Sequence, residues 1–284
     1  MQIKELLQLA VTAEASDLHL TNGMPPLLRI DGTVKPLSAF NVLDAHQLKK
    51  MIYSLLSDLQ VKDFEKTLEL DCSIYSDGSR FRANIHRQKG ATEAAIRVIP
   101  SKIKTLSQLG MPPSVAELAK KKSGLVLLTG SAGSGKTTTL ASMIDLINTE
   151  RFGVIITIED PIEYLFSNKN CIIKQREIGA DTISFAAALK SALRQDPNVI
   201  MVGEMRDLET ISTAITAAET GHLVLSTLHT PDAPQSIDRL IDVFPEGKQA
   251  EIRTQLAGCL QGIVSQQLLQ RSDGRGRVAA VEVL

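Results

Sequence analysis

The stretch that decides the fold is GSAGSGKT at residues 130–137, which matches the P-loop pattern G-x-x-x-x-G-K-[ST]. Gly130 and Gly135 let the backbone wrap a phosphate chain without side-chain collision. Lys136 is expected to reach the β- and γ-phosphates, and the Thr137 hydroxyl is expected to join the ligand shell of a Mg²⁺ ion. The residues expected to contact a nucleoside triphosphate are Gly130, Ser131, Ala132, Gly133, Ser134, Gly135, Lys136, Thr137 and Thr138.

The segments around this loop have the context that a P-loop requires. Residues 124–129 read as a short apolar strand, and residues 138–147 read as a helix that begins at the phosphate site. Further apolar strands at residues 154–158, 199–202 and 222–225 alternate with helices near residues 138–149, 183–195 and 207–219. This alternation predicts an α/β domain with a mainly parallel sheet, in which ligands gather at the carboxyl ends of the strands. The alternative is a Gly-Ser turn that binds no ligand.

A smaller α+β domain is predicted ahead of the P-loop, over residues 1–99. Helices are expected at residues 3–14 and 43–56, strands at residues 16–20, 27–30, 71–75, 81–86 and 94–99, and turns at Asp31-Gly32 and Asp77-Gly78. Prolines at positions 100, 112 and 113 and a lysine run at 120–122 place a linker at residues 100–122, followed by the α/β domain at 123–284. Because residues 278–284 read as a strand with no cap after it, we expect the chain to stop short of a complete structural unit.

Composition limits the class of protein. The chain has 284 residues, 43% of them hydrophobic, and a formal net charge of −1, which is typical of a soluble globular protein with no overall attraction to nucleic acid. Cys72, Cys171 and Cys259 are far apart and odd in number, so we expect buried thiols instead of a disulfide framework or a zinc site. With no signal sequence and no long apolar run, the expected compartment is the cytoplasm.

Acidic residues follow two of the predicted strands. Residues 154–158 lead into Glu159, Asp160 and Glu163, and residues 199–202 lead into Gly203 and Glu204. Hydrolysis needs one carboxylate to position a water and a second acid near Mg²⁺. Gly203 stands where a Walker B motif usually has aspartate, so Glu204 is expected to supply the negative charge. For Glu159 and Asp160 alone, a solvated strand-end acid or a helix cap is the alternative.

Two histidines, His222 and His229, lie at opposite ends of another predicted strand. Either one is a candidate to sense the phosphates or to relay their state to a neighbouring subunit. A surface or core histidine with no such role is the alternative.

Taken together, these segments resemble the type II/IV secretion ATPase family, most of all its branch that retracts type IV pili. The resemblance covers essentially the whole chain. It rests on residues 15–20 (ASDLHL), 29–32 (RIDG), 158–163 (IEDPIE), 199–207 (VIMVGEMRD) and 222–229 (HLVLSTLH), together with the P-loop. The resemblance implies a PAS-like N-terminal domain joined to a RecA-like ATPase domain and assembly into a homohexameric ring that hydrolyses ATP with Mg²⁺.

The resemblance also implies roles for single residues. Glu163 resembles the general base that activates water, Glu204 resembles the Walker B acid, and His222 and His229 match two histidines of the family. Arg82 and Arg97 look like arginines of the N-terminal domain that reach the γ-phosphate, a role that suits a cation supplied across a closing cleft. Charge on an edge strand is the alternative for both arginines.

The expected function is therefore a motor that drives pilus retraction through an inner-membrane platform protein, from the cytoplasmic face of the membrane and without nucleic acid. Within the family, an extension or type II secretion ATPase is the alternative. From other classes, the alternatives are a RecA-like nucleic-acid motor and a non-catalytic ring subunit. Ser131 and Ala132 depart from the family's usual P-loop. The family continues past the position of Leu284 into a further helical region, which puts full motor function in doubt for this form.

Overall fold

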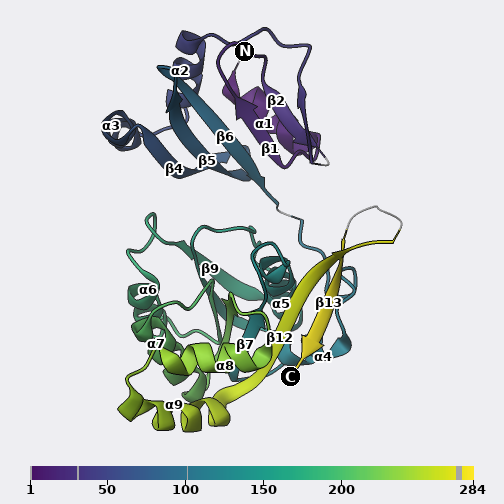
Figure 1. Ribbon diagram of the computed structural model, residues 1–284, viewed down its shortest axis with the longest axis vertical. Helices are drawn as coiled ribbons and strands as arrows, with labels where there is room; N and C mark the ends of the chain where they lie inside the picture. Colours follow the sequence, from purple (N-terminus) through teal and green to yellow (C-terminus); the bar gives the residue numbers. More distant parts are fainter. Residues whose placement is uncertain (1, 31, 101, 273–276) are drawn as a thin grey trace. The chain divides into compact units, whose positions relative to one another are not determined.

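The computed structural model describes residues 2–30, 32–100, 102–272 and 277–284 and divides into two compact units, Met1–Ser101 and Lys102–Leu284 (Figure 1). The division falls at the beginning of the segment expected to be a linker. Residues 102–122 group with the second unit and include a helix, α4 (Pro113–Ala119), whose Val115 and Leu118 are buried. In the described residues, no helix is long and apolar enough to cross a membrane.

The first unit is an antiparallel sheet with helices packed against it. Its elements are α1 (Ile3–Thr12), β1 (Asp17–Leu20), β2 (Leu27–Ile30), β3 (Thr33–Pro36), α2 (Ala45–Tyr53), α3 (Asp58–Thr67), β4 (Glu69–Ser76), β5 (Ser79–Gln88) and β6 (Ala91–Ile99). The strand order is β3-β2-β1-β6-β5-β4. Leu6, Leu18, Ile52, Phe64 and Phe81 are buried in one cluster, because the apolar faces of the helices and the alternate residues of the strands meet there.

The second unit holds the predicted parallel sheet. Its further elements are β7 (Gly124–Thr129), α5 (Lys136–Glu150), β8 (Gly153–Glu159), β9 (Cys171–Glu177), α6 (Phe185–Ala192), β10 (Val199–Val202), α7 (Leu208–Glu219), β11 (Leu223–Leu228), α8 (Ala233–Asp242), α9 (Glu246–Cys259), β12 (Leu260–Gln270) and β13 (Arg277–Val283). The strand order is β13-β12-β7-β11-β10-β8-β9, and only the β12–β13 pair is antiparallel among the described pairings.

Both faces of this second sheet are covered, which explains why its central strands are apolar throughout. Leu125 and Leu127 of β7 share a cluster with residues of α6 to α9, whereas Val126 and Leu128 share one with residues of α4 and α5. Successive residues of a strand point to opposite faces, so a single strand contributes to both clusters. The result is three layers, with helices on each side of the sheet (Figure 1).

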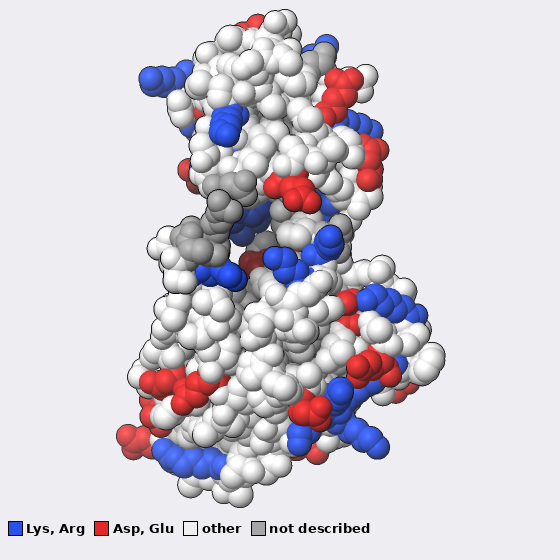
Figure 2. Space-filling view, turned by 90° about the vertical axis from the view of Figure 1, so that its right-hand side faces the viewer, with Lys and Arg blue, Asp and Glu red and all other residues white. Residues whose placement is uncertain are grey.

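Several elements differ from the sequence-based expectation. Helix α5 begins at Lys136, inside the P-loop motif, instead of at residue 138. Strands β3, β9 and β12 and helices α3, α8 and α9 were not predicted. β3 is exposed along its length, so it has no buried face to give an alternating pattern. The Asp77-Gly78 turn joins β4 to β5, with positive φ at both residues. For the turn expected at Asp31-Gly32, Asp31 lies outside the described residues. Figure 2 shows side chains of both charges on the visible face of each unit.

Candidate active site

The P-loop follows β7 directly and has glycine where the backbone leaves no room for a side chain. Gly130 has φ +144°, and a Cβ there would lie 2.3 Å from the backbone oxygen of Gln266. Gly135, the residue before α5, has φ +91°, and its Cβ would lie 2.6 Å from Nε2 of Gln266. Both glycines are therefore required by the left-handed backbone and by the strand β12 that packs behind the loop.

Lys136 is buried at the beginning of α5, and its ammonium lies within the loop. Nζ donates to the backbone oxygens of Gly130 at 2.7 Å and Ser131 at 2.9 Å. Burial lowers the pKa of Lys136, and the nearby carboxylates of Glu163 and Glu204 oppose that shift. The fold therefore brings the predicted lysine and both predicted acids into one electrostatic site.

The remaining P-loop residues surround this lysine. Ser131, Ala132 and Gly133 are exposed, Ser134 is buried, and Thr137 is partly buried in the first turn of α5. Thr138 is bound at 2.8 Å to the hydroxyl of Tyr164, which belongs to the connection that carries Glu163. This contact ties the beginning of the P-loop helix to the connection after β8.

Gln266, a residue that the sequence analysis missed, supports the P-loop from β12. Its side chain is 2% exposed; Nε2 donates to the backbone oxygen of Ser134 at 2.8 Å, and Oε1 accepts from the Thr139 hydroxyl at 2.8 Å. A buried amide with both ends satisfied fixes the loop's geometry. The one available signal was a polar residue two positions after the apolar run Ile263-Val264.

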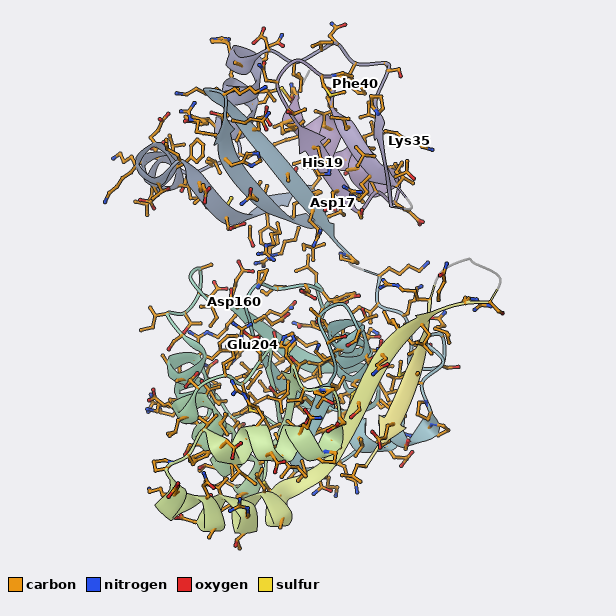
Figure 3. All side chains as sticks on the ribbon, viewed as in Figure 1. Asp17, His19, Lys35, Phe40, Asp160 and Glu204 are labelled. Atoms are coloured by element: carbon orange, nitrogen blue, oxygen red, sulfur yellow. The ribbon has the colours of Figure 1, made fainter. Side chains whose placement is uncertain are left out.

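The acids after β8 differ from one another in environment. Asp160 is exposed, as expected for a strand-end acid, and the Asp160–Pro161 peptide bond is cis. Glu159 is only 4% exposed, so neither a solvated acid nor a helix cap describes it. Glu163 is exposed, in a connection without helix or strand, where its carboxylate can meet a water molecule. Figure 3 places Asp160 and Glu204 at the same edge of the second unit.

Glu204 follows β10, forms an ion pair with Arg206 and lies beside the imidazole of His229. Its Oε1 lies 2.7 Å from Nε of Arg206, and its Oε2 lies 3.6 Å from Nε2 of His229. The structure also gives a reason for glycine at 203, since a Cβ there would lie 3.2 Å from the backbone oxygen of Ile158. A side chain at 203 would press on the neighbouring strand, so the acid stands one residue later.

The two histidines lie at opposite ends of the inner strand β11. β11 is parallel to β7, with Leu228 opposite Thr129, so His229 adjoins the P-loop edge. Burial lowers the pKa of His229, Lys136 adds to this effect, and Glu204 opposes it. His222 lies at the other end of β11, and its Nδ1 is 2.9 Å from the backbone oxygen of Ala217. The fold thus brings His229, and not His222, beside the predicted acid Glu204.

Arg82 and Arg97 belong to the first unit, on the adjacent strands β5 and β6, where they face each other in register. Together with Asp17 they line a hollow of about 290 Å³. Arg97 is paired with Asp17, with 2.9 Å between Nε and Oδ1. In Figure 3, Asp17 lies on β1 beside this pair of strands. The two arginines are therefore neighbours, with Arg97 already paired to a carboxylate, and their expected γ-phosphate role stays a prediction.

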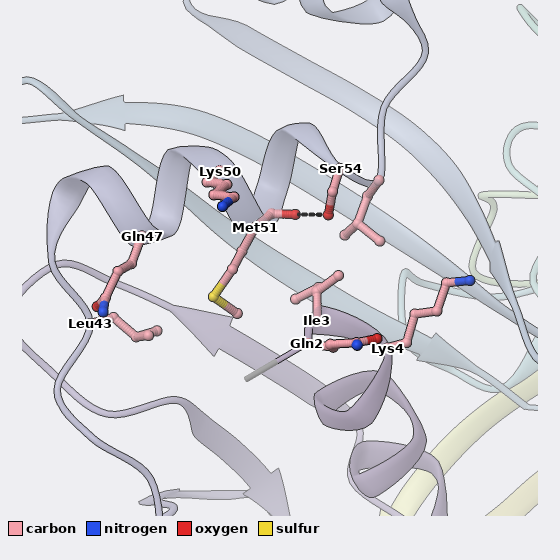
Figure 4. A pocket seen from close by; sticks show the side chains of 9 residues that line it. Gln2, Ile3, Lys4, Leu43, Gln47, Lys50, Met51 and Ser54 are labelled. Carbon is pink, nitrogen blue, oxygen red and sulfur yellow. Dashed lines mark hydrogen bonds between the residues drawn. The ribbon is translucent and has the colours of Figure 1, made fainter.

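A second hollow of the first unit, about 470 Å³ in volume, lies between the beginning of α1 and helix α2 (Figure 4). Ile3, Leu43, Met51 and Leu55 give it an apolar lining, and polar and basic side chains complete it. The predicted site residues are not among those that line it.

Comparison with known proteins finds relatives over the full length of the chain. Residues 1–283 match the family model for Type II/IV secretion system protein. The type IV pilus retraction ATPase PilT of Pseudomonas aeruginosa is 48% identical over 285 residues, covering 100% of this chain and 82% of that protein. A twitching motility protein of Neisseria gonorrhoeae is 45% identical over 260 residues, covering 91% of this chain and 69% of that protein.

Solved structures of ATPases are also similar to this chain over nearly its whole length. The crystal structure of the pilus retraction motor PilT with bound ADP has 50% sequence identity and a TM-score of 0.94, covering 100% of this chain and 83% of that one. The ATPase DotB of Legionella pneumophila has 29% identity and a TM-score of 0.82, covering 99% of this chain and 80% of that one.

Proposed function

Because this chain belongs to the type II/IV secretion system protein family, we propose that it is an ATP-hydrolysing motor subunit that powers the retraction of type IV pili. The observation that carries ATP hydrolysis is the convergence of Glu163 and Glu204 on the P-loop lysine, Lys136. The assignment to retraction is supported by the similarity to PilT over the whole chain.

In the proposed reaction, Glu163 accepts a proton from water as the water oxygen bonds to the γ-phosphorus. The bond between that phosphorus and the β–γ bridging oxygen breaks, and ADP and phosphate leave. Lys136 neutralises charge on the phosphoryl oxygens, and the P-loop backbone amides hold the other phosphates. The exposed position of Glu163 admits the water, while burial of Lys136 strengthens its attraction to the phosphates.

The residues present suit a Mg²⁺ ion bound together with ATP. Thr137 offers a hydroxyl in the first turn of α5, and Glu204 offers a carboxylate at the neighbouring strand end. Mg²⁺ prefers such hard oxygen ligands, keeps several waters and takes the rest of its shell from substrate phosphates. When bound, the ion supplies charge neutralisation on the β- and γ-phosphates.

Hydrolysis in this proposal is coupled to movement through a homohexamer. Arg82 and Arg97 reach the γ-phosphate, so that its loss changes how the two units associate, and His229, which lies beside Glu204, senses the phosphates or relays their state to a neighbouring subunit. The ring acts at the cytoplasmic face of the inner membrane on a platform protein of the pilus machinery. The in-register pairing of the two arginines on β5 and β6 supports their joint action on one anion.

ATP turnover of the purified protein tests the enzymatic part of the proposal. Wild type should hydrolyse ATP in the presence of Mg²⁺. Glu163→Gln should bind nucleotide but turn it over about 10²- to 10⁴-fold more slowly, the range for loss of general base catalysis. Lys136→Ala should lose both binding and turnover. A wild-type rate no faster than those of the two variants would refute the motor, and a severalfold stimulation by single-stranded DNA would favour a nucleic-acid motor.

A further inference from the structure

The connection that carries Glu163, between β8 and β9, is held by side chains from the ends of those two strands. Successive backbone amides of Ile162 and Glu163 donate to two different carboxylates, to Glu177 Oε2 at 2.9 Å and to Glu159 Oε2 at 3.4 Å. Glu159 and Glu177 are directly opposite each other in the β8–β9 pairing. The main chain that leads into the proposed base is therefore anchored to a pair of neighbouring strand ends.

Gln175, two residues earlier on β9, extends this anchoring along the connection. Its Nε2 donates to the backbone oxygen of Tyr164 at 2.8 Å and to Glu159 Oε1 at 3.1 Å. Its Oε1 accepts from the backbone amide of Phe166 at 2.9 Å. One side chain thus fixes the connection on the far side of Glu163 and also orients Glu159.

Glu159 is a carboxyl group buried away from water, which costs free energy unless its oxygens are hydrogen-bonded. It is 4% exposed, and burial raises its pKa, while hydrogen bonds from Thr157, Gln175 and the Glu163 amide oppose the shift. The Thr157 hydroxyl donates to Oε1 at 2.6 Å, so three donors converge on the carboxylate. Such a group is tolerated only when its oxygens are hydrogen-bonded, and the three donors bond to both oxygens of Glu159.

We propose that Glu159, oriented by Gln175, is a positioning residue that sets the direction in which the Glu163 carboxylate meets the attacking water. This inference rests on the proposed function, in which Glu163 is the base. Displacing a reacting group by about 1 Å costs on the order of 10² in rate, so a loose anchor at Glu159 reduces the chemical step more than it changes nucleotide binding at the P-loop.

Glu159→Gln tests this arrangement with almost no change of shape. The amide of the new glutamine has one NH₂ group where the carboxylate had an oxygen. In either orientation this NH₂ group faces an N–H donor, the Glu163 amide or Gln175 Nε2, so one of these two hydrogen bonds is lost. We expect kcat to fall about 10- to 100-fold, while the affinity for ADP changes less than about threefold.

Asn148→Ala is the matched control. Asn148 is also fully buried and holds the later part of the same connection, through the backbone amides of Lys169 and Cys171 and the backbone oxygen of Ser167. Its replacement should lower the melting temperature as Glu159→Gln does, yet leave kcat within about twofold.

The outcomes separate the inference from the function on which it depends. A strong loss of kcat in Glu163→Gln with none in Glu159→Gln overturns the inference alone. Equal losses of kcat in Asn148→Ala and Glu159→Gln overturn it as well, because general loosening of the connection would then explain the effect. Wild-type turnover in both Glu163→Gln and Glu159→Gln overturns the proposed base and the inference together.

Discussion

Replacing Gln266 by leucine should detach the P-loop from the strand behind it. The side chain is buried, and its two polar atoms bind Ser134 and Thr139 at 2.8 Å each. Leucine has a similar volume but bonds neither group. The variant therefore leaves the Ser134 carbonyl and the Thr139 hydroxyl buried without their partner, while the apolar packing changes little.

The magnitude follows from the cost of the two unpaired groups. Each buried polar group that loses its partner costs about 1–3 kcal/mol, so we expect Gln266→Leu to lower the free energy of unfolding by about 2–6 kcal/mol. Relaxation of Ser134 shifts the neighbouring loop amides away from the phosphates. A tenfold change in affinity corresponds to about 1.4 kcal/mol. We therefore expect ADP affinity to fall at least tenfold if only part of the lost stabilisation acts on the conformation of the P-loop.

Equilibrium binding of a fluorescent ADP analogue, measured beside urea denaturation, tests both expectations. Gln267→Leu is the control, because it makes the same chemical change one residue later, at an exposed position on the other face of β12. The control should bind ADP as wild type does. If Gln266→Leu unfolds more easily but binds ADP with wild-type affinity, the proposed support of the P-loop is wrong.

Two further predictions concern the same unit. Gly130→Ala should weaken ADP binding at least tenfold, because the new Cβ would lie 2.3 Å from the Gln266 backbone oxygen. In the control Gly133→Ala the new Cβ has no atom within 4 Å, so the substitution should cost only the strain of the left-handed backbone, about 1–2 kcal/mol. Equally poor ADP binding by the control would contradict the steric argument. The lowered pKa of His229 means that the folded state binds fewer protons than the unfolded state. The contribution of His229 to the free energy of unfolding is therefore fully present above pH 6.5, its ordinary pKa, and is lost as the pH falls below that value. Thermal melting from pH 5 to 8 should show a flatter dependence in His229→Asn than in wild type, and identical slopes would refute this contribution.

The parts of the site that the sequence predicted are those in which local pattern dictates position. A glycine-rich loop between an apolar strand and a helix identifies Lys136, because the chain can fold there in few ways. Glu163 and Glu204 could be expected beside it because the carboxyl ends of parallel strands share one edge. The structure places both acids within electrostatic reach of Lys136, as that reasoning required.

The supporting residues could not be predicted in the same way. Gln266 is 132 residues from Ser134 in the sequence, and the two meet only because β12 pairs with β7 after five intervening helices, α5 to α9. Gln175 lies on the edge strand β9, where exposed and buried residues do not alternate regularly enough to indicate a strand. Burial of Glu159 depends on these same pairings. Such contacts follow from the register of distant strands, which local propensity does not encode.

The most direct test of the central claim is pilus retraction by living cells. In a strain that lacks this protein, fluorescently labelled pili should extend and fail to withdraw. Wild-type protein should restore retraction, whereas Glu163→Gln at the same cellular level should leave the pili extended. Complete loss of pili in the null strain would point to extension instead. Retraction at the wild-type rate with Glu163→Gln would contradict the claim that hydrolysis at this site drives the motor.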